Sequence, residues 1–231
     1  MIRTQEADGM CTVVLDRPER RNALTRAGLA ELQEAVVDAD APVLYLTGAG
    51  EAFCAGADLE TVAGLSRESA VEFAREGQQV ANALAQYDGA VVAGITGAAR
   101  GGGVELALAC DVRVGTPDAT FAESGVSLGL FGAWGGTSRL PAVVGEGHAM
   151  DIALSGRVLG AETAAAVGLL SRVVEDPRTV AAGLAAHDSR ALRTIKRLVA
   201  ADESQEAAEE REAAAFGERI AQSNEDRLGG A

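Results

Sequence analysis

Residues 90–110 read AVVAGITGAARGGGVELALAC, an apolar stretch, a glycine-rich turn and a second apolar stretch in succession. The run at 90–96 favours a strand, and residues 104–110 favour a short helix opened by three glycines. Residues 43–59, VLYLTGAGEAFCAGADL, likewise lead from an apolar strand at 43–47 into glycine turns. Strands that alternate with helices are typical of a mostly parallel sheet covered by helices. These two stretches therefore predict an α/β fold.

The rest of the chain continues this alternation and then becomes helical. We expect further strands at 11–15, 112–114 and 120–121, and further helices at 25–38, 68–87, 188–200 and 203–221. Thr25 is the expected N-cap of the helix at 25–38, and the inner face of the helix at 68–87 carries Val71, Ala74, Val80, Ala81 and Leu84. The expected organisation is an α/β core at 1–175 and a C-terminal helical region at 176–231.

Composition excludes several classes of protein. Of the 231 residues, 48% are hydrophobic and 23% are charged, which is typical of a folded globular chain rather than a disordered one. The formal net charge of −14 repels phosphate backbones and anionic lipid surfaces, so neither nucleic acid nor a membrane is an expected partner. The longest uncharged run, at 124–138, is too short to span a bilayer.

The cysteines and histidines indicate neither a disulfide framework nor a metal site. Cys11, Cys54 and Cys110 are widely spaced, and His148 and His187 belong to no HExxH motif. We therefore expect reduced cysteines and no metal or other cofactor. The N-terminus has no basic-then-apolar signal pattern, so we expect a soluble cytoplasmic protein.

Two glycine-rich turns are the best candidates for a binding site. Residues 52–59 (AFCAGADL) and 100–106 (RGGGVEL) let the backbone approach a ligand closely, and N–H groups at a helix start attract negative charge. If the turns meet at the carboxyl ends of neighbouring strands, two N–H groups point at one carbonyl oxygen and form an oxyanion hole. The alternative is that both are ordinary tight turns. The chain has no GxGxxG and no P-loop motif that would favour a nucleotide site.

Glu105 is the candidate acidic residue beside the second turn. It lies in the first turn of the helix that follows the three glycines, among apolar neighbours. A carboxylate there either complements the positive end of the helix dipole or acts as a general acid/base beside an oxyanion hole. The spacing alone leaves both interpretations open.

Five motifs follow one another in an order that resembles a known family. They are LDRPERRNALT (15–25), LYLTGAGEAFCAGADL (44–59), AARGGGVELALACDVRVGTPDATFAESGVSLGL (98–130), GGTSRLPAVVG (135–145) and LSGRVLGAETAAAVGLLSRVV (154–174). Together they resemble the crotonase superfamily, the enoyl-CoA hydratases and isomerases, continuously over about residues 10–175. The resemblance implies a crotonase-like spiral of ββα repeats with C-terminal helices that cover the pocket or assemble a homotrimer or a dimer of trimers.

The resemblance also implies a substrate class and a set of site residues. The substrate is an acyl-CoA thioester, and coenzyme A arrives as part of it, so no separate cofactor is needed. In such enzymes two backbone N–H groups stabilise a thioester enolate, and by motif these fall at Ala57 and Gly102. Glu105 matches the first of two family glutamates. The residues implied to line the substrate groove are Arg21, Asn22, Ala23, Leu24, Ala55, Gly56, Asp58, Leu59, Gly101, Gly125 and Trp134.

One departure from the family pattern affects the expected reaction. The position of the second family glutamate falls on Gly125, which cannot transfer a proton. Glu123, two residues earlier, either reaches the site or is an ordinary loop carboxylate. Hydration of a 2-enoyl-CoA is the favoured reaction. The alternatives are an enoyl-CoA isomerase, an acyl-CoA decarboxylase that needs only one carboxylate, and a catalytically silent acyl-CoA binding protein.

The arginines and the single tryptophan leave further alternatives. Arg100, next to the glycines, pairs either with a carboxylate such as that of Glu105 or the substrate, or with a surface residue. The chain ends in DRLGGA without the basic and aromatic stretch that family members commonly have, so binding of the CoA 3′-phosphate is either weak or supplied by Arg17, Arg20 and Arg21, which are equally typical of a solvated turn. Trp134 either forms the floor of the acyl pocket or belongs to the core.

Overall fold

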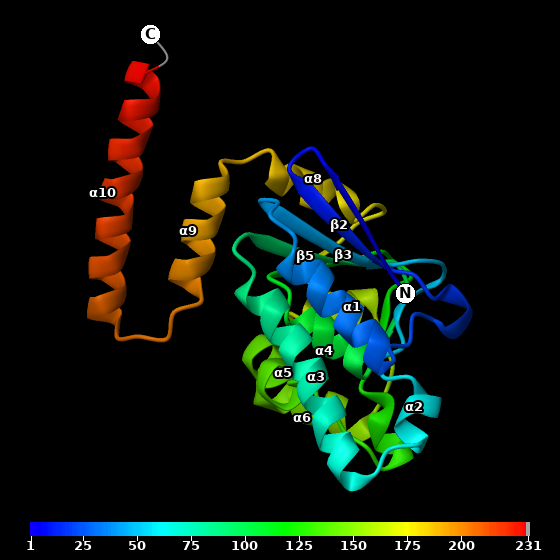
Figure 1. Ribbon diagram of the computed structural model, residues 1–231. Coiled ribbons are helices and arrows are strands. Elements are labelled where there is room, and N and C mark those ends of the chain that lie inside the picture. The colour runs from blue at the N-terminus through cyan, green and yellow to red at the C-terminus, as the bar shows by residue number, and fades with distance from the viewer. Residues whose placement is uncertain (230–231) are drawn as a thin grey trace. The chain divides into compact units, whose positions relative to one another are not determined.

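The computed structural model describes residues 1–229, with side chains to residue 223, and divides into two compact units, Met1–Ala186 and His187–Ala231. The first unit is built from repeats of two strands followed by helix (Figure 1). The repeats are β1 (Ile2–Ala7), β2 (Met10–Leu15) and α1 (Arg26–Val37); β3 (Val43–Gly48), β4 (Ala52–Cys54), α2 (Leu59–Ala63) and α3 (Arg67–Gln86); β5 (Ala90–Ile95), β6 (Ala98–Arg100) and α4 (Gly102–Leu108); and β7 (Val112–Gly115), β8 (Thr120–Ala122) and α5 (Gly136–Val144).

The strands of the repeats form two sheets. In every repeat after the first, the first strand joins a six-stranded sheet of order β1-β2-β3-β5-β7-β10, and the second strand joins a four-stranded sheet of order β4-β6-β8-β9. The short strands β9 (Leu159–Gly160) and β10 (Arg172–Val173) complete them. Among the strand pairs within residues 1–229, only β1–β2 and β8–β9 are antiparallel. The predicted mostly parallel α/β architecture is confirmed.

The central strand β3 shows that the six-stranded sheet is covered on both faces. Its residues 43–46 (VLYL) are all buried, as expected for a parallel strand covered on both sides. Leu44 and Leu46 belong to the main core, whereas Tyr45 alternates to the other face. Helix α8 (Arg178–Ala185) contacts β2, β3 and β5, and Figure 1 shows it on the opposite side of this sheet from α1 and α3.

Helices α1 and α3 form where caps and apolar spacing predict them, with one error in the face assigned to α3. The Thr25 hydroxyl accepts a hydrogen bond from Gly28 N at 3.2 Å and begins α1 as expected. On α3 the buried positions include Phe73 and Gly77, which continue the stripe of Val80, Ala81 and Leu84 at helical spacing. The prediction that Val71 belongs to this face is wrong: two residues before Phe73 it lies on a different side of the helix, 48% exposed.

Periodicity predicts neither the short strands β4 and β6 nor the helices α2 and α5. β4 and β6 have three residues each; the turn predicted at 52–59 includes β4, and the turn predicted at 100–106 includes only Arg100 of β6. β1 is polar and mostly exposed, so it has no apolar alternation to identify it. The remaining short elements of the first unit are helices α6 (Glu146–Ser155) and α7 (Ala161–Ala166) and the 3₁₀ turns η1 (Pro18–Arg20) and η2 (Ser124–Leu128).

The second unit contains α9 (Ser189–Val199) and α10 (Gln205–Gly229), close to the two predicted helices. Asp188 begins α9, because its Oδ1 accepts from Ala191 N at 2.8 Å, and it pairs with Arg219 of α10 at 2.8 Å. Helix α8, in the expected C-terminal region 176–231, belongs to the first unit, and residues 230 and 231 of that region lie outside the described residues. No helix within residues 1–229 has both the length and the apolar composition to cross a bilayer.

The core predicts a large difference between two apolar truncations. Leu84→Ala removes a fully buried side chain of α3 and is expected to lower the free energy of unfolding by about 2–5 kcal/mol. Val37→Ala, at a side chain that is 67% exposed, should change it by less than about 0.5 kcal/mol. Urea denaturation followed by circular dichroism measures both, and equal losses would contradict this packing.

Candidate active site

The two glycine-rich turns leave neighbouring parallel strands at the same end. β4 pairs with β6 in register, Ala52 with Ala98 and Cys54 with Ala99. The first turn follows β4 and the second follows β6 and leads into α4. Both turns therefore lie at the carboxyl edge of the four-stranded sheet, which is the arrangement that the oxyanion-hole interpretation requires.

The turns approach each other so closely that side chains are excluded between them. A Cβ at Gly56 would lie 2.7 Å from Arg100 O and 2.8 Å from Gly102 N, and the φ of Gly56 is +84°. A Cβ at Gly103 would collide with the carbonyl oxygen of Cys54. Glycine at these positions lets one turn pack directly on the backbone of the other.

Two N–H groups remain without partners where the turns meet. Two hydrogen bonds to Leu24 hold the backbone on either side of Ala57. Leu24 N donates to Gly56 O at 2.8 Å, and Asp58 N donates to Leu24 O at 2.9 Å. Within residues 1–229, neither Ala57 N nor Gly102 N has a hydrogen-bond acceptor. Both residues line the same cavity. A ligand oxygen in that cavity would complete hydrogen bonds that the protein leaves open.

This cavity, which we call the reaction cavity, has a volume of ≈ 210 Å³ and a mostly apolar wall. Of the residues predicted from the sequence, those that line it are Ala55, Ala57, Leu59, Gly101, Gly102, Glu105, Gly125 and Trp134. Those that lie outside its lining are Arg21, Asn22, Ala23, Leu24, Gly56 and Asp58. Residues that sequence reasoning did not assign to it come from α2, α3 and the stretch after η2; among them are Phe73, Leu130 and Phe131.

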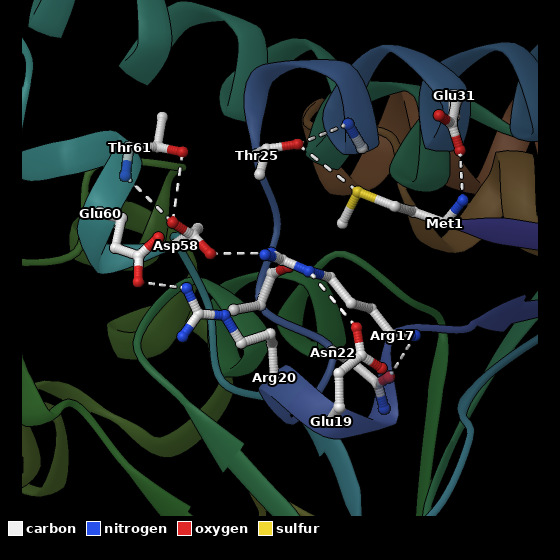
Figure 2. Close-up of polar contacts among 12 residues, drawn as sticks. Met1, Arg17, Glu19, Arg20, Asn22, Thr25, Glu31, Asp58, Glu60 and Thr61 are labelled. Atoms are coloured by element: carbon white, nitrogen blue, oxygen red, sulfur yellow. Dashed lines mark hydrogen bonds and ion pairs between the residues drawn. The ribbon is translucent and has the colours of Figure 1, made fainter.

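Asn22 and Asp58 hold the first turn from positions outside the cavity lining, and Figure 2 shows the contacts of Asp58 with Thr61 and Arg17. Asn22 is buried, and its Nδ2 donates to the carbonyl oxygens of Ala52 at 2.7 Å and Ala49 at 2.9 Å. Asp58 begins α2 by accepting from Thr61 N at 3.0 Å, and it pairs with Arg17 at 2.7 Å. The hydrogen bonds from Thr61 and Arg17 hold the pKa of Asp58 below its usual value.

The carboxyl group of Glu105 is buried and accepts hydrogen bonds from two backbone N–H groups. Its side chain is almost fully buried, and Oε1 accepts hydrogen bonds from Trp134 N at 2.8 Å and Gly136 N at 2.6 Å. Burial raises the pKa of Glu105, while the hydrogen bonds from these backbone N–H groups act against that rise because they stabilise the carboxylate. The partners are Trp134, in the loop before α5, and Gly136, the first residue of α5, so Glu105 does not merely complement its own helix dipole.

Glu123 brings a second carboxyl group to the same cavity. It precedes η2, lines the reaction cavity and is 7% exposed. Its Oε1 is buried and has no hydrogen-bond partner within the described residues. Burial, and then the charge of Glu105, raise the pKa of Glu123 to about 8. A Cβ at Gly132 would lie 3.0 Å from Glu105 Oε1 and 3.4 Å from Glu123 Oε2, so both carboxyl groups lie close to the same glycine.

Trp134 is both a core residue and part of the cavity wall. It is 3% exposed and makes an edge-to-face contact with Phe73 at a centroid distance of 5.9 Å. A Cβ at Gly77 of α3 or at Gly102 of α4 would collide with its ring. The indole therefore fits between two helices at positions that lack side chains, and it fixes the backbone N–H that Glu105 accepts.

The arginines have partners other than those considered from the sequence. Arg100 Nη1 donates to the carbonyl oxygens of Ala99 and Thr120, both at 2.9 Å, and among the described residues it forms no ion pair. The proposed pairing with Glu105 is therefore wrong, because the guanidinium instead binds strands β6 and β8 together. Arg17 pairs with Asp58 and Arg20 with Glu60, and the role predicted for them at a phosphate stays a prediction.

The cysteines are structural and no metal cluster is present among the described side chains. Cys11, Cys54 and Cys110 are buried, and within the described residues none of them forms a disulfide bond. Burial raises the pKa of Cys54 to about 12, so its thiol is not ionised at neutral pH. The described residues contain no group of three or more His, Cys, Asp or Glu side chains that could hold a metal ion.

The chain is similar in sequence and in fold to several known proteins. The family model for enoyl-CoA hydratase/isomerase matches residues 5–227. Crotonyl-CoA hydratase of Syntrophomonas wolfei is 35% identical over 176 residues, which are 74% of this chain and 68% of the relative. Short-chain-enoyl-CoA hydratase of Clostridium acetobutylicum is 35% identical over 74% of this chain and 67% of the relative. The crystal structure of enoyl-CoA hydratase from Bacillus anthracis has a TM-score of 0.91 at 32% identity, covering 99% of this chain and 93% of that one.

The contact between the turns predicts that an alanine at Gly103 destabilises the protein, whereas an alanine at Gly147, far from any neighbour, does not. Gly103→Ala pushes α4 away from the Cys54 carbonyl and is expected to lower the free energy of unfolding by about 1–3 kcal/mol. Gly147→Ala, in α6 with open space around it, should be neutral or stabilise by up to about 1 kcal/mol, because alanine favours a helix. Thermal unfolding of the two variants tests this, and a neutral Gly103→Ala would show that the turns are not in contact.

Proposed function

The chain belongs to the enoyl-CoA hydratase/isomerase family, and on that premise we propose that it hydrates a 2-enoyl-CoA to a 3-hydroxyacyl-CoA. One observation supports this reaction above the alternatives: two unpartnered backbone N–H groups and two buried carboxyl groups share one apolar cavity. Hydration requires a site for developing negative charge on oxygen, a base for water and an acid for carbon. The cavity has a candidate for each.

The N–H groups of Ala57 and Gly102 bind the thioester oxygen. Attack of water on the β-carbon moves electron density through the conjugated system to this oxygen and produces an enolate. Preorganised donors in a site with little water stabilise such a charge strongly, and losing one donor typically costs about 10²–10³ in rate. Gly102 is the first residue of α4, so the positive end of the helix adds to the same effect.

Glu105 and Glu123 divide the proton transfers. Hydrogen bonds from two backbone N–H groups favour the carboxylate form of Glu105, which removes a proton from water as its oxygen bonds to the β-carbon. Glu123 has no such donors to Oε1, and burial keeps it protonated at neutral pH, so it gives its proton to the α-carbon as the enolate collapses. Return of one proton from Glu105 to Glu123 restores both groups, and the net change is addition of water.

Glu123 replaces the missing carboxyl group at Gly125. A one-carboxylate site was the argument for a decarboxylase or a silent binding protein, and with Glu123 beside Glu105 the cavity has two. The reaction as proposed uses no metal or redox cofactor, since coenzyme A is part of the substrate.

Assembly and location are further parts of the proposal. We assign the helices α9 and α10 to contacts between subunits of a homotrimer or a dimer of trimers, because apolar side chains such as Ile195, Val199 and Phe216 are exposed in the single chain. The three buried cysteines form no disulfide bond within the described residues, which fits a reducing cytoplasm.

The test is a panel of crotonyl-CoA, a 3-enoyl-CoA and methylmalonyl-CoA with matched variants. We expect hydration of crotonyl-CoA, and a loss of at least about 10²-fold in kcat for both Glu105→Gln and Glu123→Gln, because each removes one proton-transfer group. Glu162→Gln, at an exposed glutamate of α7, is the control and should keep full activity. Turnover of another panel member alone, or full activity of Glu123→Gln, would overturn the assignment.

The pH dependence follows from the two carboxyl groups. Glu123 must be protonated, so kcat/KM should fall as pH rises through about 8, and it should fall again in acid as Glu105 takes up a proton. Because burial raises the pKa of Glu123 only in the folded state, the wild type should also lose thermal stability relative to Glu123→Gln as the pH rises from about 4.5, the ordinary pKa of a glutamate, to about 8, and the difference should level off above that. A Tm difference between the two proteins that stays constant from pH 6 to about 9 would contradict this titration.

A further inference from the structure

A second cavity shares part of its wall with the reaction cavity. It has a volume of ≈ 210 Å³ and lies among η2, α5 and α6. Three residues line both cavities: Glu123, Phe131 and Gly132. We call it the rear cavity. The residues that separate the two are therefore only one layer thick.

The wall of the rear cavity is that of an apolar binding site. It is formed by aliphatic side chains and glycines, among them Val126, Leu140, Ala149 and Met150. Its ionisable side chains are Glu123, whose pKa burial raises, and Glu146. A cavity of this composition favours hydrocarbon over a charged or strongly hydrogen-bonding group.

Gly132 contributes no side chain to the partition. The carboxyl groups of Glu105 and Glu123 lie beside it, since a Cβ there would be 3.0 Å from Glu105 Oε1 and 3.4 Å from Glu123 Oε2. Phe131 borders both cavities, yet it is 77% exposed, which is unusual for so large an apolar side chain. A hydrocarbon chain that passes Gly132 would cover this ring.

We propose that the rear cavity binds the distal end of the substrate's acyl chain, so that this enzyme accepts medium-length linear 2-enoyl-CoA thioesters. The inference rests on the proposed function and deepens it. With the thioester oxygen at Ala57 and Gly102, the α- and β-carbons lie between Glu105 and Glu123, and the following carbons pass Gly132. A methylene group occupies about the volume of a water molecule, about 30 Å³, so the rear cavity holds on the order of half a dozen.

The proposal predicts a dependence on chain length. Each methylene that enters an apolar cavity should raise kcat/KM by about three- to fourfold, because it leaves water, until the cavity is full. The wild type should therefore prefer 2-enoyl-CoA thioesters of about eight to ten carbons over crotonyl-CoA, with no further gain beyond that length.

The experiment uses variants that fill the rear cavity without touching the reaction cavity. Ala149 is buried and lines only the rear cavity, and Ala149→Leu should lower kcat/KM for a ten-carbon substrate at least tenfold while crotonyl-CoA activity stays within twofold. Ala153→Leu, at an exposed position of the same wall, is the second variant and should act in the same direction. Ala182→Leu, exposed on α8 away from both cavities, is the control.

The outcomes separate this inference from the proposed function. If no enoyl-CoA of any length is hydrated, the proposed function fails. If crotonyl-CoA is hydrated but Ala149→Leu and Ala153→Leu leave the chain-length profile unchanged, only the rear-cavity inference is overturned. A variant that loses crotonyl-CoA activity and ten-carbon activity equally would also overturn it, because the cavity would then serve folding and not the acyl chain.

Discussion

The direct backbone contact between the turns after β4 and β6 is the constraint on which the site depends. Gly56 lies against the amide of Gly102, and Gly103 lies against the carbonyl of Cys54, so no side chain separates the two turns. The parallel pairing of β4 with β6 makes both turns leave at one edge, and the remaining N–H groups of Ala57 and Gly102 have no acceptor within residues 1–229. Two donors held by a rigid scaffold need little rearrangement when charge develops on a bound oxygen. Asn22 and Asp58, outside the cavity, hold the first turn in this shape.

The carboxyl groups show how similar burial produces different protonation. Glu105 and Glu123 are both nearly inaccessible, and burial raises the pKa of both. Two backbone N–H groups then stabilise the charged form of Glu105, whereas Oε1 of Glu123 has no donor within the described residues and faces a carboxylate. Trp134 links these effects to the core, because its packing between glycines of α3 and α4 places one of the donors to Glu105. A pair of carboxyl groups whose environments separate their pKa values is suited to acid and base roles.

Much of this organisation is predictable from the sequence, and the failures have physical causes. The glycine turns, Glu105 and the alternation of strands and helices follow from local patterns. Helical spacing places Val71 on the buried face of α3, but its side chain lies on another side of the helix and is exposed. Strands β4 and β6 are too short to show a periodic pattern. Glu123 was left open because its position two residues before Gly125 says nothing about side-chain direction; the turn at η2 directs it into the cavity. Arg100 was expected beside a carboxylate, yet the carbonyl groups of Ala99 and Thr120 are closer, which only the strand pairing reveals.

The most direct test of the central claim is a crystal structure of the protein with a bound, unreactive acyl-CoA thioester. The account predicts that the thioester oxygen lies about 2.7–3.2 Å from both Ala57 N and Gly102 N, with the α- and β-carbons between the carboxyl groups of Glu105 and Glu123. A thioester oxygen that contacts only one of these N–H groups, or that lies elsewhere in the cavity, would contradict it.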